Sequence, residues 1–144
     1  LLYDKKQHVV AAVHAGWKGT VKHIVSHVMD HLNQKFGTQG EDVVACIGPS
    51  ISLESFEVGD EVYDAFKESG FDMSLISMKK KETGKYHIDL WEANRIELLN
   101  AGVPAEQIEV AGICTYIRYE DYFSARRLGV KSGRILTGIC LKKS

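Results

Sequence analysis

An apolar segment, Val9–Val13, leads into His14 and then into a turn bracketed by Gly16 and Gly19. Five consecutive apolar residues are typical of a buried strand, and closely spaced glycines mark a tight turn. A helical pattern of apolar residues begins directly afterwards at Thr20. A buried strand, a short turn and an amphipathic helix in succession predict an α/β fold.

His14 stands at the end of this strand, where a side chain can project into a crevice. The local pattern allows two interpretations. The histidine either hydrogen-bonds within the core or belongs to a functional site, and the residues further along the chain favour the second interpretation.

The composition restricts the possible partners. With 144 residues and 44% hydrophobic content, the chain is long enough for one domain with a core. Eighteen Lys and Arg residues against nineteen Asp and Glu residues leave a formal net charge of -1, so no global field favours nucleic acid or an acidic membrane surface. No apolar run reaches membrane-spanning length and no leader pattern is found. We expect a cytoplasmic protein that binds neither nucleic acid nor a membrane.

The three cysteines, Cys46, Cys114 and Cys140, are scattered and form no Cys-x-x-Cys pair. An odd number of separated cysteines indicates a reducing compartment. Each lies in an apolar stretch, where free cysteine usually packs as a small hydrophobe. We therefore expect no disulfide framework.

Strands and helices alternate along the rest of the chain. The predicted strands are 1–3, 9–13, 43–47, 86–89, 109–115 and 135–141. The predicted helices are 20–36, closed by Gly37, then 58–67, followed by Gly70, and 90–100, followed by Gly102. This order predicts mixed sheets in an α/β (α+β) fold.

Three histidines recur every four positions on the first predicted helix, at His23, His27 and His31. This spacing can place imidazoles on one helical face as metal ligands. The stripe lies beside the apolar face, however, and Lys22 and Asp30 are its neighbours. A solvated surface is therefore the favoured interpretation.

A second strand end, at Gly48-Pro49-Ser50, also forms a special turn. Glycine frees the backbone and proline restricts it in adjacent positions. This combination is suited to aiming Ser50 at a ligand, so we include Ser50 among the candidate substrate-binding residues.

The last third of the chain concentrates basic residues. They are Arg118, Arg126, Arg127, Lys131 and Arg134. Guanidinium groups match the geometry of phosphate and carboxylate groups, which favours an anion site. The alternative is a structural network with Glu120 and Asp121.

Six blocks, taken in order, resemble one family, the laccase-domain proteins, which are also called multicopper polyphenol oxidase-like proteins or peptidoglycan editing factors. The blocks are His14-Ala15-Gly16-Trp17-Lys18-Gly19, Ile47-Gly48-Pro49-Ser50-Ile51, Phe56-Glu57-Val58-Gly59-Asp60-Glu61-Val62, Asp89-Leu90 with Asn94, Cys114-Thr115, and Phe123-Ser124-Ala125-Arg126-Arg127 with Gly129, Gly133 and Arg134. The resemblance covers nearly the whole chain.

The resemblance implies a multilayer α/β sandwich with mixed sheets, in a single laccase-like domain over residues 1–144. It also implies one zinc or copper ion held by two histidines and one cysteine, with His14 as one ligand. The other two ligands, a histidine and a cysteine, belong to family blocks that would precede Leu1. We therefore expect that the N-terminal part of the domain is missing, that this part is a partner, and that the 144 residues alone are inactive. Ser50 departs from the family pattern, in which cysteine often follows Gly-Pro.

The function that the resemblance implies is phosphorolysis of purine nucleosides such as adenosine, inosine and methylthioadenosine, with adenosine deamination as a related activity. In this interpretation, His14 and Arg126 are catalytic, with His14 holding the metal and Arg126 holding phosphate. Arg127 and Arg134 support the phosphate, and Trp17 stacks on the base.

Three alternatives stay open. One is a Cys/His hydrolase or amidase that edits peptidoglycan precursors, with His14 as the base for the upstream cysteine. A second is a copper polyphenol oxidase. The third is a non-enzymatic module that binds nucleotides through the arginine segment. We rank the phosphorylase above these alternatives.

Overall fold

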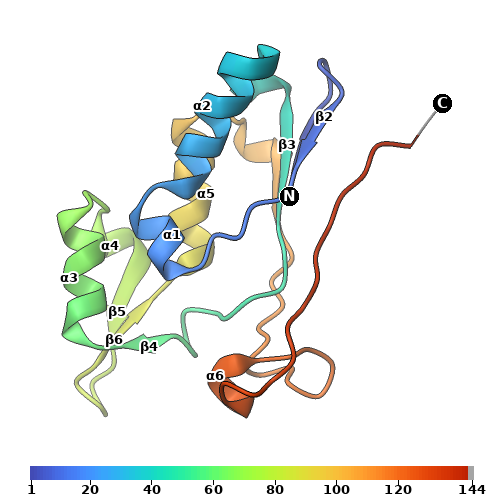
Figure 1. The fold of residues 1–144 in the computed structure, drawn as a ribbon. Coiled ribbons are helices and arrows are strands. Elements are labelled where there is room, and N and C mark those ends of the chain that lie inside the picture. Colours follow the sequence, from blue (N-terminus) through green and yellow to red (C-terminus); the bar gives the residue numbers. More distant parts are fainter. Residues whose placement is uncertain (143–144) are drawn as a thin grey trace. The chain divides into compact units, whose positions relative to one another are not determined.

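The computed structural model describes residues 1–142 (Figure 1). These residues form two compact units. The first unit contains residues 1–48, 94–111 and 137–142, and the second contains residues 49–93 and 112–136. Both units combine helices with a sheet, which confirms the predicted α/β class. The helix α5 (Leu90–Asn100) crosses the boundary and has the limits predicted from the sequence.

The first unit is built on a four-stranded sheet in the order β2 (Val9–Ala11), β1 (Leu2–Asp4), β3 (Val43–Ile47) and β7 (Ile108–Val110). β1 pairs antiparallel with both β2 and β3, whereas β3 pairs parallel with β7. The short 3₁₀ helices η1 (Gly40–Asp42) and η2 (Ala105–Gln107) precede β3 and β7. The strand that we predicted over residues 109–115 therefore ends five residues early, at Val110.

Helix α2 (Ile24–Phe36) and the second half of α5 provide the apolar side chains that pack on this sheet (Figure 1). The buried core of the unit comprises Leu2, Val25, Met29, Leu32, Val43, Ala45, Leu98 and Val103. The predicted apolar stripe on α2 is thus largely confirmed. Phe36 is the exception, because it lies at the end of the helix and is exposed.

The helix predicted over residues 20–36 is two helices, α1 (Trp17–Val21) and α2, so the continuous helix was wrong. The break is at His23, whose φ of 54° is left-handed and cannot continue an α-helix. Gly37 ends α2 with a φ of 74°, as predicted. His27 and His31 are exposed, as expected for a solvated stripe, but His23 is half-buried.

The second unit contains a three-stranded antiparallel sheet in the order β4 (Glu57–Val58), β6 (Tyr86–Ile88) and β5 (Ser77–Lys79). The helices of this unit before α5 are α3 (Asp60–Glu68) and α4 (Met73–Ile76). The helix predicted from Val58 begins at Asp60 instead, because Val58 pairs with Tyr86 in the sheet.

Aromatic side chains join α3 to its surroundings in this unit. Phe66 is fully buried and meets Phe71 edge-on, with ring centroids 5.3 Å apart. Tyr63 stacks on Tyr86 of β6, with centroids 3.8 Å apart. Aromatic pairs of this kind add to the free energy gained from burial, so they fix α3 on its sheet.

Helix α6 (Ala125–Leu128) is the last element, and residues 129–142 contain neither helix nor strand. The strand predicted over residues 135–141 was therefore wrong, because a strand needs a neighbour to pair with and this segment has none among residues 1–142. Of the twelve large apolar side chains that are exposed in this range, nine lie between Ile117 and Leu141. None of the helices in residues 1–142 has the length and apolarity that a membrane span requires.

Candidate functional site

The loop between β2 and α1 carries His14. The strand predicted over residues 9–13 ends two residues early, at Ala11, and His14 is exposed rather than packed in the core. Gly16 is the N-cap of α1 with an extended backbone, at φ -69° and ψ 169°. The loop thus presents an imidazole to solvent directly before a helical turn.

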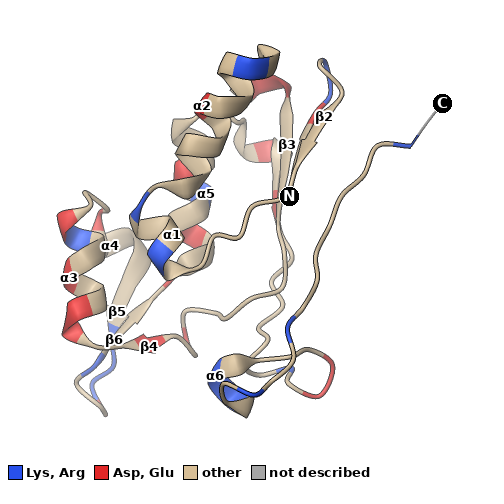
Figure 2. Cartoon of the chain, in the orientation of Figure 1, with Lys and Arg blue, Asp and Glu red and all other residues tan. Residues whose placement is uncertain are grey.

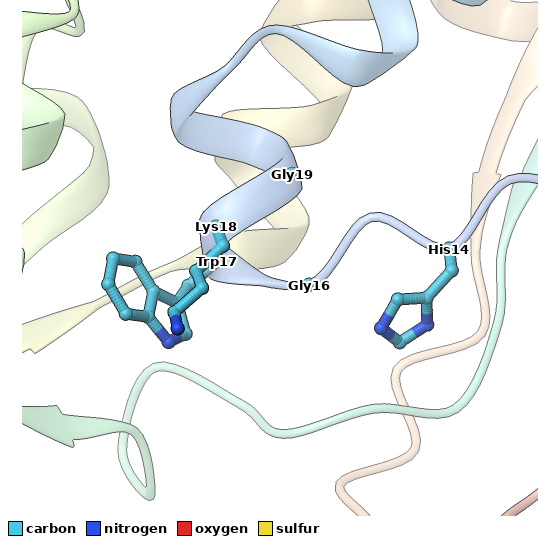
Figure 3. A pocket seen from close by; sticks show the side chains of 5 residues that line it. All are labelled: His14, Gly16, Trp17, Lys18 and Gly19. Carbon is cyan, nitrogen blue, oxygen red and sulfur yellow. The ribbon is translucent and has the colours of Figure 1, made fainter.

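A shallow pocket of about 220 Å³ lies beside this imidazole, lined by His14, Gly16, Trp17, Lys18 and Gly19. In Figure 3 the rings of His14 and Trp17 project to the same side of the segment that joins them. The structure therefore brings together the predicted metal ligand and the predicted base-stacking residue. Pockets that bury a whole small ligand usually have about 300–1,000 Å³, so this pocket is sized for part of such a ligand.

The Trp17 ring is half-buried, and the Lys18 ammonium lies 5.6 Å from its centroid. A cation at this distance is attracted by the ring quadrupole. Trp17 is therefore a wall of the pocket with one positive neighbour.

Two buried hydrogen-bonding groups lie behind the loop. The hydroxyl of Thr20 is 3.2 Å from the carbonyl oxygen of Ala15 and 3.1 Å from that of Gly16. The amide of Asn94 on α5 donates to the same hydroxyl at 3.1 Å. Thr20 and Asn94 are 1% and 6% exposed, so water does not compete for these bonds.

A buried carboxylate, Glu97, fixes the junction between α1 and α2. Its Oε1 accepts from His23 Nδ1 at 2.7 Å, and its Oε2 accepts from the Ser26 hydroxyl at 2.7 Å. Glu97 is 5% exposed, and a buried carboxylate needs such partners to offset its desolvation. These bonds account for the left-handed backbone at His23.

A metal site requires more ligands than this pocket provides. A catalytic zinc ion takes about three protein ligands, and a single imidazole does not retain one. No group of three or more His, Cys, Asp or Glu side chains within residues 1–142 is arranged to hold a metal ion. His14 can therefore be only one member of a ligand set, and the donors described do not complete it.

Ser50 lies in the second unit, directly after the Gly48-Pro49 turn. The indole Nε1 of Trp91 donates to its Oγ at 2.5 Å, and its backbone forms a parallel bridge with Cys114. The hydroxyl that we predicted to face substrate is thus engaged by an aromatic side chain of the same unit.

The Cys114 thiol is buried beside two serines. The backbone N–H of Ser52 donates to the sulfur at 3.4 Å, and the sulfur lies 3.5 Å from the Ser55 hydroxyl. Burial, the largest single effect, raises the pKa of this thiol, but hydrogen bonds from Ser52, Ser55 and the backbone of Ile117 outweigh it and lower the pKa to about 7. Cys114 therefore ionises more readily than an ordinary cysteine.

The predicted phosphate-binding arginines lie on and after α6, which Figure 2 shows as a basic segment. Arg126 Nη1 donates to the backbone oxygen of Glu57 at 2.7 Å, and its guanidinium lies 5.2 Å from the Phe56 ring centroid. Arg127 lies 5.2 Å from the ring centroid of Tyr116 and 4.6 Å from that of Tyr119.

The alternative interpretation of these basic residues, a structural network with Glu120 and Asp121, holds only in part. Arg118 pairs with Asp121 at 2.5 Å, as the structural network predicted. Arg126 and Arg127 instead use a carbonyl group and aromatic rings, and Arg134 donates to the backbone oxygens of Ser132 and Gly133. The paired arginine is thus distinct from the three that we assigned to phosphate.

Sequence reasoning missed several of these residues. Thr20, Asn94 and Glu97 were not singled out for a role at His14, and Trp91 was not connected with Ser50. Asn94 stood in one of the blocks that carry the family resemblance, and this was the only signal available for it. The distance of 74 residues between Thr20 and Asn94 hides their contact from any local pattern.

Comparison with known proteins places these features in context. The sequence family described as "Multi-copper polyphenol oxidoreductase laccase" matches residues 1–142. A protein named purine nucleoside phosphorylase from Bacteroides thetaiotaomicron is 64% identical over 143 residues, which are 99% of this chain and 53% of that protein. A protein named adenosine deaminase RL5, from an unknown prokaryotic organism, is 44% identical over 99% of this chain and 54% of its own length.

Solved structures support the same fold. The Bacillus licheniformis protein YfiH aligns with a TM-score of 0.80 at 34% identity, over 88% of this chain and 47% of that one. YlmD from Geobacillus stearothermophilus aligns with a TM-score of 0.71 at 35% identity, over 80% of this chain and 43% of that one. The chain thus spans about half the length of the proteins that it matches.

Proposed function

Because this chain belongs to the multi-copper polyphenol oxidoreductase laccase family, we propose that it is part of an enzyme that cleaves purine nucleosides with inorganic phosphate. The observation that carries this proposal is the exposed His14 beside a pocket at the end of β2. The name of the 64% identical relative supports phosphorolysis as the reaction. The expected products are ribose 1-phosphate and the free base.

The pocket of the first unit is suited to a purine ring. Trp17 supplies an aromatic face and His14 a polar group, and a volume of about 220 Å³ accommodates a base rather than a whole nucleoside. We assign base stacking to Trp17, with His14 beside it in the same pocket.

The arginines of the second unit are assigned to phosphate. Arg126 uses one N–H group on the Glu57 carbonyl, and a guanidinium has five N–H donors. Its contact with the Phe56 ring orients the guanidinium. An oriented guanidinium can donate two parallel N–H groups to the oxygens of a phosphate. Arg127 and Arg134 contribute further positive charge.

Phosphorolysis replaces the bond between the anomeric carbon and the base nitrogen by a bond to a phosphate oxygen. As the base leaves, positive charge develops on the sugar, so a phosphate held in place lowers the barrier. We also propose His14 as one ligand of a single zinc or copper ion whose other ligands, a histidine and a cysteine, come from outside this chain. When bound, such an ion would polarise a substrate atom or activate water, and the roles given to Trp17 and the arginines do not depend on it.

Adenosine deamination is the second candidate, because the relative that is 44% identical is named adenosine deaminase. One experiment separates the two. The whole protein is incubated with adenosine, with and without inorganic phosphate, and the products are identified by mass spectrometry. Adenine and ribose 1-phosphate formed only with phosphate support phosphorolysis, whereas inosine and ammonia formed without it support deamination. Unchanged adenosine under both conditions would contradict both proposals.

A further inference from the structure

The loop that carries His14 is held from behind by polar side chains rather than by apolar packing. Thr20 N donates to the Gly16 carbonyl at 2.9 Å, and the Thr20 hydroxyl lies within 3.2 Å of the carbonyl oxygens of Ala15 and Gly16. Two consecutive carbonyl groups therefore converge on one threonine. This residue therefore holds the peptide groups that follow Ala15 and Gly16, one and two residues beyond His14.

The direction of these bonds follows from Asn94. Its Nδ2 lies 3.1 Å from Thr20 Oγ1, closer than its Oδ1 at 3.5 Å. An amide nitrogen only donates, so the Thr20 oxygen accepts there and its own hydrogen is directed to the loop carbonyls. Asn94 thus fixes the rotation of a hydroxyl that would otherwise be able to turn.

Asn94 is itself held in a regular element, helix α5. It lies three residues before Glu97 on α5, which places both side chains on one face of that helix. Glu97 binds His23 and Ser26 and Asn94 binds Thr20, so the segment from Thr20 to Ser26 is anchored to α5. Sites are most precise when their residues are held by buried hydrogen bonds to regular elements.

We propose that Thr20 and Asn94 are positioning residues that fix the loop backbone and thereby the orientation of the His14 imidazole. The functional importance of this orientation rests on the proposed role of His14 in the site. The hydrogen-bond relay is itself independent of any substrate, and both residues are more than nine-tenths buried. A buried hydroxyl with both a donor and an acceptor partner costs free energy when it is removed.

The test uses a matched pair of variants in the full chain. Thr20→Val removes the hydroxyl and keeps the shape, whereas Thr20→Ser keeps the hydroxyl. Thr38→Val is the control, since Thr38 is a second buried threonine of the same unit, at 2% exposure. The measurements are amide hydrogen exchange of residues 20–23, which include the N–H donors to the carbonyl groups of Gly16, Gly19 and Thr20, and the NMR resonance of the His14 imidazole, both without substrate.

We expect exchange of residues 20–23 to be roughly tenfold faster in Thr20→Val, which corresponds to the loss of one buried hydrogen bond. The His14 resonance should shift in Thr20→Val, return in Thr20→Ser and stay unchanged in Thr38→Val. If Thr20→Val does not fold, Asn94→Ala takes its place, because it removes the donor and keeps the hydroxyl.

An unchanged His14 resonance in Thr20→Val would overturn the proposal, as would a Thr20→Ser variant that fails to restore it. The same shift in Thr38→Val would show a general loss of stability instead of positioning. Since neither measurement involves turnover, a protein without phosphorylase activity would leave this result intact, and the two proposals fail separately.

Discussion

The Nε2 atom of His14 lies 3.2 Å from the position that a Cβ atom would take on Gly16. This distance is shorter than an ordinary van der Waals contact between such atoms. The imidazole therefore rests against a residue that has no side chain, and the space it occupies depends on that absence.

Replacing Gly16 by alanine tests this relationship. The backbone angles at Gly16, φ -69° and ψ 169°, suit alanine, so the fold should tolerate the change while the ring has to move. In the whole protein, we expect the proposed phosphorolysis to fall by about tenfold or less, because small displacements of a group in the site are costly. Activity assays with a melting curve check this. Gly138→Ala is the control, since no atom lies within 4 Å of its added Cβ; equal activity in both variants would contradict the prediction.

Replacing Arg126 by alanine should raise the KM for phosphate by about tenfold or more, which corresponds to one charge-assisted hydrogen bond. The KM for nucleoside should change less. Steady-state kinetics with phosphate as the varied substrate measure both. Arg118→Ala is the matched control, because Arg118 pairs with Asp121 in the same unit. Phosphate dependence that is the same in both variants would remove Arg126 from the site.

His23 has a left-handed backbone conformation, so variants with glycine and with alanine at this position should differ in stability. Both substitutions remove the imidazole that binds Glu97, but only alanine retains the steric penalty of a φ near 54°. After allowance for the greater flexibility of glycine in the unfolded chain, we expect His23→Gly to be more stable than His23→Ala by about 0.5–1 kcal/mol. Urea denaturation of the two variants measures this difference. If His23→Ala were as stable as His23→Gly, the fold would not need the left-handed conformation at this position.

The thiol of Cys114 should titrate near neutral pH. Its pKa is lowered from 9.0 to about 7 in the folded chain. The thiolate therefore stabilises the fold above the ordinary pKa near 9, and this contribution is lost as the pH falls towards 7. In a variant with serine at Cys46 and Cys140, the ultraviolet absorbance of the thiolate follows the titration. Ser55→Ala removes one hydrogen bond and should raise the midpoint; an unchanged midpoint would exclude Ser55 as a cause.

Local patterns predicted those elements whose limits are set by nearby residues. Helix α5 has the predicted ends because its residues are good helix formers and Gly102, at φ 86°, follows its end. The break at His23 was missed because its cause, Glu97, is 74 residues away in the sequence. The strand over residues 135–141 was predicted from apolar content, which does not guarantee a neighbouring strand.

The candidate site was predictable to a similar extent. The place of His14 after an apolar strand left both a buried and an exposed histidine possible, and the blocks further along the chain favoured the exposed one; Trp17 was predicted from the same short segment as His14. The Thr20 and Asn94 pair was not predictable, because buried threonine and asparagine are ordinary residues whose partners only the tertiary fold brings close.

Leu136 is 97% exposed and Val130 is 88% exposed, in a segment that runs outside any sheet. Exposed apolar side chains on backbone that no sheet pairs favour contacts with other copies of the chain. We therefore expect concentrated solutions of the chain to self-associate, and a lysine at Leu136 to reduce this association without disturbing the packed interior.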